Sequence, residues 1–245
     1  MRNSTLLRNL ITILFLLLLS VAPVFAADFQ KGLDAALRGD FATAQQEWRP
    51  LAEQGNAVAQ YNLGQMYRNG DGVTEDDSQA VYWYKKAAEQ GHAKAQYNLG
   101  VMYSYGEGVA EDDTQAVYWY RKAAEQGYAK AQYNLGLKYG KGEGVAEDYI
   151  LAYKWANLAA AQGDKDAIEF KNDLRKLMTQ AQIAEAQRLS REWSPEQSKA
   201  ESGKAVTTPG RKQNPPDYTG SSFVVSRNGH VLTNRHVVVG CATLR

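Results

Sequence analysis

The sequence predicts an all-α fold of stacked helix pairs. Two observations support this fold class: a step of 36 residues recurs through the middle of the chain, and apolar residues within each step follow the spacing of one helical face. The step is marked by four glycines: Gly55, Gly91, Gly127 and Gly163. Fourteen of the 15 tyrosines fall between Tyr61 and Tyr153, so the repetition lies in that part of the chain.

Each unit contains the signals for two helices. The first helix is expected from about Ala57 to Asn69, and the glycine-rich turn Gly70–Val73 ends it because glycine adopts positive φ without strain. Asp76 then offers an acceptor to the free N–H groups at the start of a second helix, with Gln79 at capping-box spacing. The second helix is expected to end near Gln90.

A glycine recurs inside each first helix, at Gly64, Gly100 and Gly136. Glycine in a helix interior costs about 1 kcal/mol relative to alanine. We therefore expect the partner helix to approach closely at these positions, and we expect a larger side chain there to push the two helices apart.

These residues resemble the Sel-one-like repeat family, a relative of the tetratricopeptide repeat. The matching positions of the first unit are Ala59, Leu63, Gly64, Tyr67, Gly70, Gly72, Val73, Asp76, Ala80, Trp83, Ala87, Ala88 and Gly91. The resemblance covers about residues 32–193. It implies a right-handed superhelix of stacked helix pairs that binds a protein or peptide partner on its concave face.

Residues 27–193 are expected to form this repeat domain, with an atypical unit at each end. Gly39–Gly55 has the pattern of a second helix, and its short partner lies near Gln30–Arg38. After Gly163 the first-helix pattern is lost. Two further helices, from Asp164 to Met178 and from Thr179 to near Trp193, are expected to cap the last repeat.

Solvent-facing amides on the first helices are the candidate peptide-binding residues: Asn62, Asn98 and Asn134. They are flanked by Gln60, Gln96 and Gln132. A ladder of amides can hydrogen-bond the backbone of an extended peptide. The alternative is that Gln-Tyr-Asn-Leu-Gly is a common filler of this family and has no binding role.

Composition excludes several other kinds of site. The 28 basic and 27 acidic residues leave a net charge of +1, which argues against a dedicated nucleic-acid binder. The single cysteine, Cys241, and three histidines cannot form a disulfide framework or a convincing zinc cluster, so no cofactor and no metal are expected. Trp83 and Tyr84 are expected in the core, and His92 in a turn.

The N-terminal segment 1–26 has the marks of a secretory signal peptide. Arg2 and Arg8 precede the apolar run Leu10–Val21, and small residues lead to a cleavage point before Ala27. We expect an exported protein, in the periplasm of a Gram-negative bacterium, with no stable membrane insertion after cleavage. The alternative is an uncleaved anchor, because the uncharged stretch of 19 residues is close to the length that spans a membrane.

Residues 194–220 change in composition and are expected to be a disordered linker. They contain four prolines together with serine, threonine, lysine and glutamine, and almost no aliphatic residues. Such a segment cannot bury enough apolar surface to offset the entropy lost on ordering.

Residues 221–245 change again, to β-branched residues with a period of two. Ser222–Ser226 and Val231–Thr233 flank Asn228-Gly229, a strong signal for a tight hairpin. The run from Gly220 to Val238 resembles the opening of bacterial trypsin-like serine peptidases, which implies that His236 is the general base. The alternative is an isolated hairpin with a surface histidine.

Two classes of function follow. The nine residues after His236 include no aspartate, glutamate or serine, so the chain as given is expected to be inactive and to be the N-terminal fragment of a longer product. We expect an exported scaffold that binds a protein or peptide. The alternative is a trypsin-like serine endopeptidase in the full-length product, with the repeats recruiting substrate or partner.

Overall fold

A computed structural model describes residues 27–195, 224–225 and 231–232. Within these residues the chain forms ten helices, α2 to α11, and two short strands. The chain divides into two units, one ending at Ala205 and the other beginning at Val206. All of the described helices belong to the first unit, which confirms the all-α fold predicted from the repeat.

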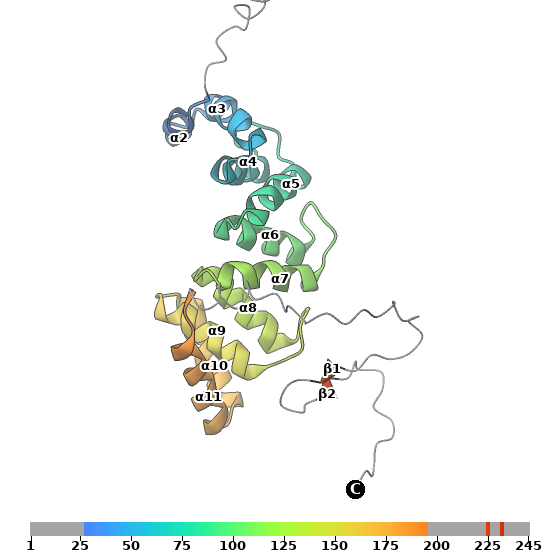
Figure 1. Cartoon of the computed structure of the whole chain (residues 1–245), viewed down its shortest axis with the longest axis vertical. Helices are drawn as coiled ribbons and strands as arrows, with labels where there is room; N and C mark the ends of the chain where they lie inside the picture. The colour runs from blue at the N-terminus through green and yellow to red at the C-terminus, as the bar shows by residue number, and fades with distance from the viewer. Residues whose placement is uncertain (1–26, 196–223, 226–230, 233–245) are drawn as a thin grey trace, which may run out of the picture. The chain divides into compact units, whose positions relative to one another are not determined.

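The helices of the first unit follow one another as stacked pairs, from α2 and α3 at the top of Figure 1 to α10 and α11 at the bottom. Their bounds are α2 (Phe29–Leu37), α3 (Phe41–Glu53), α4 (Ala57–Asn69), α5 (Asp77–Glu89), α6 (Ala93–Tyr105), α7 (Asp113–Ala124), α8 (Ala129–Lys141), α9 (Tyr149–Ala161), α10 (Lys165–Leu177) and α11 (Gln180–Glu192). Within the repeats α4 packs on α5, α6 on α7 and α8 on α9, and each pair also contacts the next. We call α4, α6 and α8 the first helices and α5, α7 and α9 the second helices.

The ends of these helices follow from local side-chain chemistry. The first helix α6 ends at Gly106, whose φ of 70° lies in the left-handed region that favours glycine. The second helix α7 begins after Asp112, whose carboxylate accepts a hydrogen bond from the backbone N–H of Gln115. The same pair of signals recurs in the neighbouring repeats, so the sequence defines where each helix starts and stops.

The glycines inside the first helices allow the two helices of a pair to approach closely. A Cβ added to Gly64 would lie 2.6 Å from a ring carbon of Tyr84, and one added to Gly100 would lie 2.7 Å from a ring carbon of Tyr120. Both tyrosines are buried in the core. A tyrosine of the second helix fills the space beside Gly64 and Gly100, whereas a Cβ added to Gly136 would lie 3.1 Å from a backbone oxygen of Ala152 in α9. The expected close approach is therefore confirmed at all three glycines.

The tryptophans of the second helices connect one repeat to the preceding one. Trp83 of α5 belongs to a cluster with Trp48 of α3, and Trp119 of α7 belongs to one with Ala87 and Ala88 of α5. Trp83 and Tyr84 are both buried, as the sequence predicts. Because each tryptophan reaches back along the stack, the core continues from repeat to repeat.

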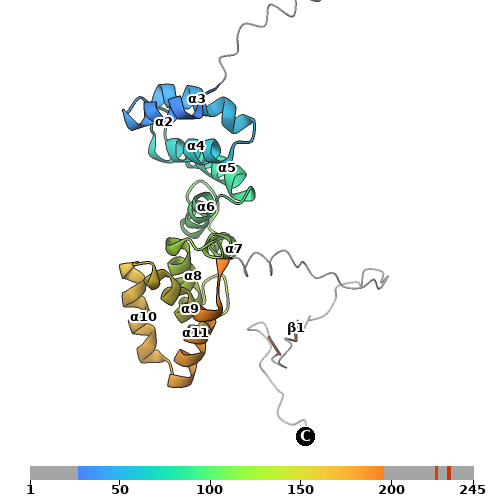
Figure 2. The same ribbon diagram turned by 60° about the vertical axis from the view of Figure 1, so that its left-hand side comes forward.

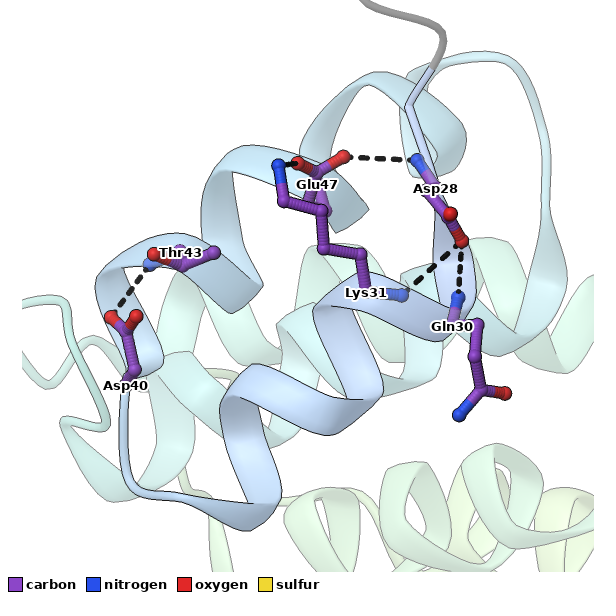
Figure 3. A network of polar contacts seen from close by, with 6 residues as sticks. All are labelled: Asp28, Gln30, Lys31, Asp40, Thr43 and Glu47. Carbon is purple, nitrogen blue, oxygen red and sulfur yellow. Dashed lines mark hydrogen bonds and ion pairs between the residues drawn. The ribbon is translucent and has the colours of Figure 1, made fainter.

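The two ends of the stack are covered in different ways. At the N-terminal end α2 is held on α3 by Glu47, which accepts a hydrogen bond from the backbone of Asp28 and pairs with Lys31 (Figure 3). The close-up also shows the carboxylates of Asp28 and Asp40 capping the starts of α2 and α3. At the other end α10 and α11 both pack on α9, at the bottom of Figure 2.

The second unit contains one pair of described strands. β1 (Val224–Val225) and β2 (Val231–Leu232) are antiparallel, with Val224 opposite Leu232 and Val225 opposite Val231. They fall within the two segments for which the sequence predicts a hairpin. His236, Cys241 and the turn residues between the strands lie outside the described residues, as do most of the proposed linker and the whole of segment 1–26.

Candidate binding face of the first helices

The three asparagines predicted as peptide contacts occupy the same position on α4, α6 and α8, and all three are half-buried. Asn98 lies beside the hydroxyl groups of Tyr61 and Tyr84, and its amide counteracts part of the rise that burial causes in the pKa of both. Asn134 has the same effect on the pKa of Tyr97 and of Tyr120. An asparagine amide has two donors and an oxygen that accepts twice, so it has hydrogen-bonding capacity for a ligand. We call the surface around Asn62, Asn98 and Asn134 the first-helix face.

A row of tyrosines runs beside the asparagines and was not singled out by the sequence. Tyr61 lies between Tyr84, at a ring distance of 5.9 Å, and His92 before α6, which stacks on it at 4.6 Å. Tyr97 lies between Tyr120 and Tyr128, and the ring of Tyr128 meets it edge-on at 5.3 Å. Burial raises the pKa of Tyr61 and of Tyr97, so both hydroxyls stay protonated at neutral pH.

His92 has a more specific role than the turn position expected for it. It is the N-cap of α6, and its Nδ1 accepts a hydrogen bond from the backbone N–H of Ala95 at 3.2 Å. Burial and the neighbouring charge of Lys94 lower the pKa of His92. The ring is therefore neutral at pH 7, as a nitrogen that accepts a hydrogen bond must be.

The glutamines that flank the asparagines in the sequence lie inside the stack. Gln60, Gln96 and Gln132 are all buried, and each donates from Nε2 to the carbonyl oxygen of an alanine near the end of the preceding helix, α3, α5 or α7. Their side-chain oxygens accept from Gln90, Gln126 and Gln162. The expectation that they extend a solvent-facing amide ladder is wrong, because their hydrogen bonds are already used within the fold.

A hollow of about 440 Å³ opens on the first-helix face at its N-terminal end. Its lining is Phe29, Leu33, Val58, Tyr61, Asn62, His92, Ala93 and Lys94. We call it the N-terminal hollow. It brings together α2, α4 and the start of α6, and the first asparagine of the row forms part of its wall.

The repeats were compared with models of known protein families. Residues 57–92, 93–128 and 129–164 each match the Sel1 repeat. Helices α4 to α9 of the first unit therefore match three consecutive Sel1 repeats. The three matched segments have the 36-residue step found in the sequence, and each contains one first helix and one second helix.

Two solved structures resemble the chain. A Sel1 repeat protein from Oxalobacter formigenes is 36% identical over 64% of this chain and 63% of its own, with a TM-score of 0.58. The protein c5321, described as a protective antigen present in uropathogenic Escherichia coli strains and as displaying an SLR fold, is 31% identical over 77% of this chain and 50% of its own, with a TM-score of 0.44. The chain thus spans less than two thirds of either relative. No curated protein matches it.

The third Sel1 repeat differs from the other two in its charge. Lys138 occupies the position of Met66 and Met102, and its ammonium group pairs with Asp113 and Glu143. Burial opposes the charge of Lys138, but hydrogen bonds to the two carboxylates hold its pKa above the usual value. These residues line a hollow of about 300 Å³ that also contains Asn134 of the candidate row.

Other chemistry can be assessed only for the described residues. Among them no group of three or more histidine, cysteine, aspartate or glutamate side chains is placed to hold a metal ion. No described helix is both long and apolar enough to cross a membrane. The candidate base His236 lies outside the described residues, so its surroundings are not part of this geometry.

Proposed function

We propose that the Sel1 repeats bind an extended segment of a protein partner along the first-helix face, the face expected to be concave. Sel1 repeats generally bind proteins. The observation that carries the proposal for this face is the row formed by Asn62, Asn98 and Asn134, with one hollow at each end. The first and last asparagines line these hollows, so a segment that follows the row would meet side-chain pockets at both ends.

The geometry suits recognition of a peptide backbone. Asn98 and Asn134 are half-buried on rigid helices, so less side-chain freedom remains to be lost on binding than for a fully exposed amide. An added hydrogen bond from each amide would contribute about 0.5–1.5 kcal/mol. Three such contacts give modest affinity by themselves, which makes side chains of the partner that enter the hollows important.

The proposal can be tested by selecting peptides from a random library on the whole chain and measuring their affinities. We expect the combined substitutions Asn62→Ala, Asn98→Ala and Asn134→Ala to lower the affinity for these peptides by about tenfold or more, because three hydrogen bonds are removed. Gln79→Ala with Gln115→Ala is the matched control, since both amides are exposed on second helices. Equal effects of the two sets would contradict binding on the first-helix face.

We also propose that the protein is exported. The support is the basic start, apolar run and small-residue exit of residues 1–26. In a Gram-negative host we expect a periplasmic protein whose N-terminus, measured by mass spectrometry, lies at or near Ala27. A membrane-bound chain that retains residues 1–26 would support the anchor instead.

A second candidate function is a trypsin-like serine peptidase in a longer gene product. It is favoured by the antiparallel pair of β1 and β2, which fits a hairpin before His236, and by the sequence resemblance around that histidine.

If the reading frame continues into such a domain, a fluorophosphonate probe should label a downstream serine. His236→Ala should then lower turnover by several orders of magnitude, whereas the neighbouring His230→Ala should change it little. Full activity in the His236→Ala protein would exclude the role of general base.

A further inference from the structure

The N-terminal hollow is mostly apolar for two reasons, a departure from the repeat at Val58 and the presence of α2. Val58 of α4, with 44% of its surface exposed, stands where the next two repeats have Lys94 and Lys130. The adjacent wall comes from α2, which contributes Phe29 and Leu33. Repeat one therefore presents an apolar pocket at the position where the other first helices present a lysine.

This wall of the hollow is held in place before any ligand arrives. Phe29 packs on Trp48 with ring centres 6.0 Å apart, and its carbonyl oxygen accepts a hydrogen bond from the indole N–H of Trp48. Glu47 fixes the start of the same helix through Asp28 and Lys31 (Figure 3). A preformed pocket loses little conformational freedom when it is filled.

The rim of the hollow is positively charged. Lys94 is exposed there, no acidic residue belongs to the lining, and Lys94 forms no ion pair within residues 27–195. His92 is neutral and stacks on Tyr61, so it adds no charge. Asp34, the acidic residue within α2, accepts a hydrogen bond from the side chain of Gln30, and the carboxylate of Asp28 caps the start of the same helix.

We propose that the N-terminal hollow receives a large apolar side chain of the partner segment, and that an acidic side chain beside it pairs with Lys94. The proposal rests on the binding function proposed above and names the chemistry of the partner at one end of the row. Apolar area removed from water provides the attraction to the hollow. The acidic neighbour provides selectivity, because a basic residue in its place would face Lys94 with like charge.

The test uses the full chain and three fluorescein-labelled peptides with the centres Asp-Phe-Asp, Lys-Phe-Lys and Asp-Ala-Asp in the same Gly-Ser flanks. Fluorescence anisotropy should show that Asp-Phe-Asp binds about fivefold more tightly than Lys-Phe-Lys, as a single exposed charge pair allows. It should bind about tenfold more tightly than Asp-Ala-Asp, because the apolar anchor is lost. No binding of Asp-Phe-Asp at millimolar concentration would overturn the proposal.

Two variants and one control, Lys130→Glu, test whether the effect arises at the hollow. Lys94→Glu should reverse the preference between the two charged peptides, whereas Lys130→Glu, the equivalent change one repeat further on, should leave it intact. Val58→Asp should remove the advantage of phenylalanine over alanine. Thermal melts of each variant check that the fold is retained, and equal effects of Lys94→Glu and Lys130→Glu would contradict the assignment.

The result also separates this inference from the proposed function. If the asparagine substitutions lower the affinity for library peptides but Lys94→Glu leaves the preference for the acidic peptide unchanged, the proposal for the hollow fails and binding on the first-helix face is supported. If Lys94→Glu reverses the preference while the asparagine substitutions have no effect, the hollow is supported and binding along the asparagine row is contradicted.

Discussion

Gln126, in the turn that follows α7, donates a hydrogen bond from its Nε2 to Oε1 of Gln96 in α6, over 2.7 Å. Gln96 in turn donates to the carbonyl oxygen of Ala88 at the end of α5, over 3.0 Å. One buried amide therefore connects three successive helices. The same arrangement recurs one repeat earlier and one repeat later, through Gln60 and Gln132.

Removing this amide should destabilise the stack. Gln96→Leu keeps the approximate size of the side chain but leaves the carbonyl of Ala88 and the amide of Gln126 without these partners. The Ala88 carbonyl keeps a hydrogen bond from the backbone of Gly91, and the Gln126 amide keeps one to the carbonyl of Lys122. The two hydrogen bonds that are lost contribute about 0.5–1.5 kcal/mol each, so we expect the free energy of unfolding, measured in urea, to fall by about 1–3 kcal/mol. The exposed Gln115→Leu is the control and should change stability by less than about 0.5 kcal/mol.

The glutamines show how a repeat can mislead an interpretation made from sequence. Gln96 and Asn98 stand two residues apart in the same recurring motif, and both look like solvent-facing amides. In a helix, residues two apart point in different directions, and Gln96 lies four residues before Gly100, on the side that meets the partner helix. A glutamine also recurs just after each second helix, as Gln90, Gln126 and Gln162. This recurrence was the further signal that the first-helix glutamines have partners inside the fold.

Gly100→Ala should destabilise the protein, although alanine is the better helix former. The added Cβ would lie 2.7 Å from a ring carbon of Tyr120, whose side chain is fully buried and cannot move aside freely. Overpacking costs about 1–3 kcal/mol, against a gain of about 1 kcal/mol in helix propensity. Thermal unfolding should show a lower midpoint for Gly100→Ala than for Gly136→Ala, whose nearest neighbour, a backbone oxygen of Ala152, would be 3.1 Å away. The reverse order would contradict this explanation.

Two adjacent aromatic residues provide a matched test of the core. Trp119 is 8% exposed and packs with α5 and α6, whereas Tyr118 is 46% exposed. Trp119→Ala should cost about 3–5 kcal/mol, because a large buried side chain is removed and a cavity remains. Tyr118→Ala should cost much less. Urea unfolding of the two variants measures both values, and similar losses would show that Trp119 is not the buried anchor.

The sequence was sufficient for the repeats because each of their signals is local and periodic. Asp112 starts a helix, Gly106 ends one and Gly100 marks a close contact, and all three recur at the same step. The N-terminal hollow could not be predicted in this way. It depends on α2, which lies outside the repeat, and on how Phe29 and Val58 are brought together in space.

His92 should make the stability of the protein depend on pH in a defined direction. Its pKa in the folded state lies below the ordinary value of 6.5, because burial and Lys94 disfavour the charged ring. The unfolded state therefore binds more protons, and the free energy of unfolding decreases as the pH falls through 6.5 toward the lower pKa of the folded state. Protonation of Nδ1 also removes the acceptor that caps Ala95 at the start of α6.

His92→Asn tests this dependence without removing the cap. Asn56 holds the equivalent position before α4 and accepts hydrogen bonds from the backbone of Val58 and Ala59, so asparagine is compatible with this site. Urea unfolding between about pH 7.5 and 5 should show a steeper loss of stability for the wild-type chain than for the variant, because only the wild type has a titrating group at this position. The difference in unfolding free energy between the two proteins should be constant above about pH 7.5, where an ordinary histidine is neutral. Parallel pH profiles down to pH 5 would show that His92 is protonated as readily in the folded as in the unfolded chain.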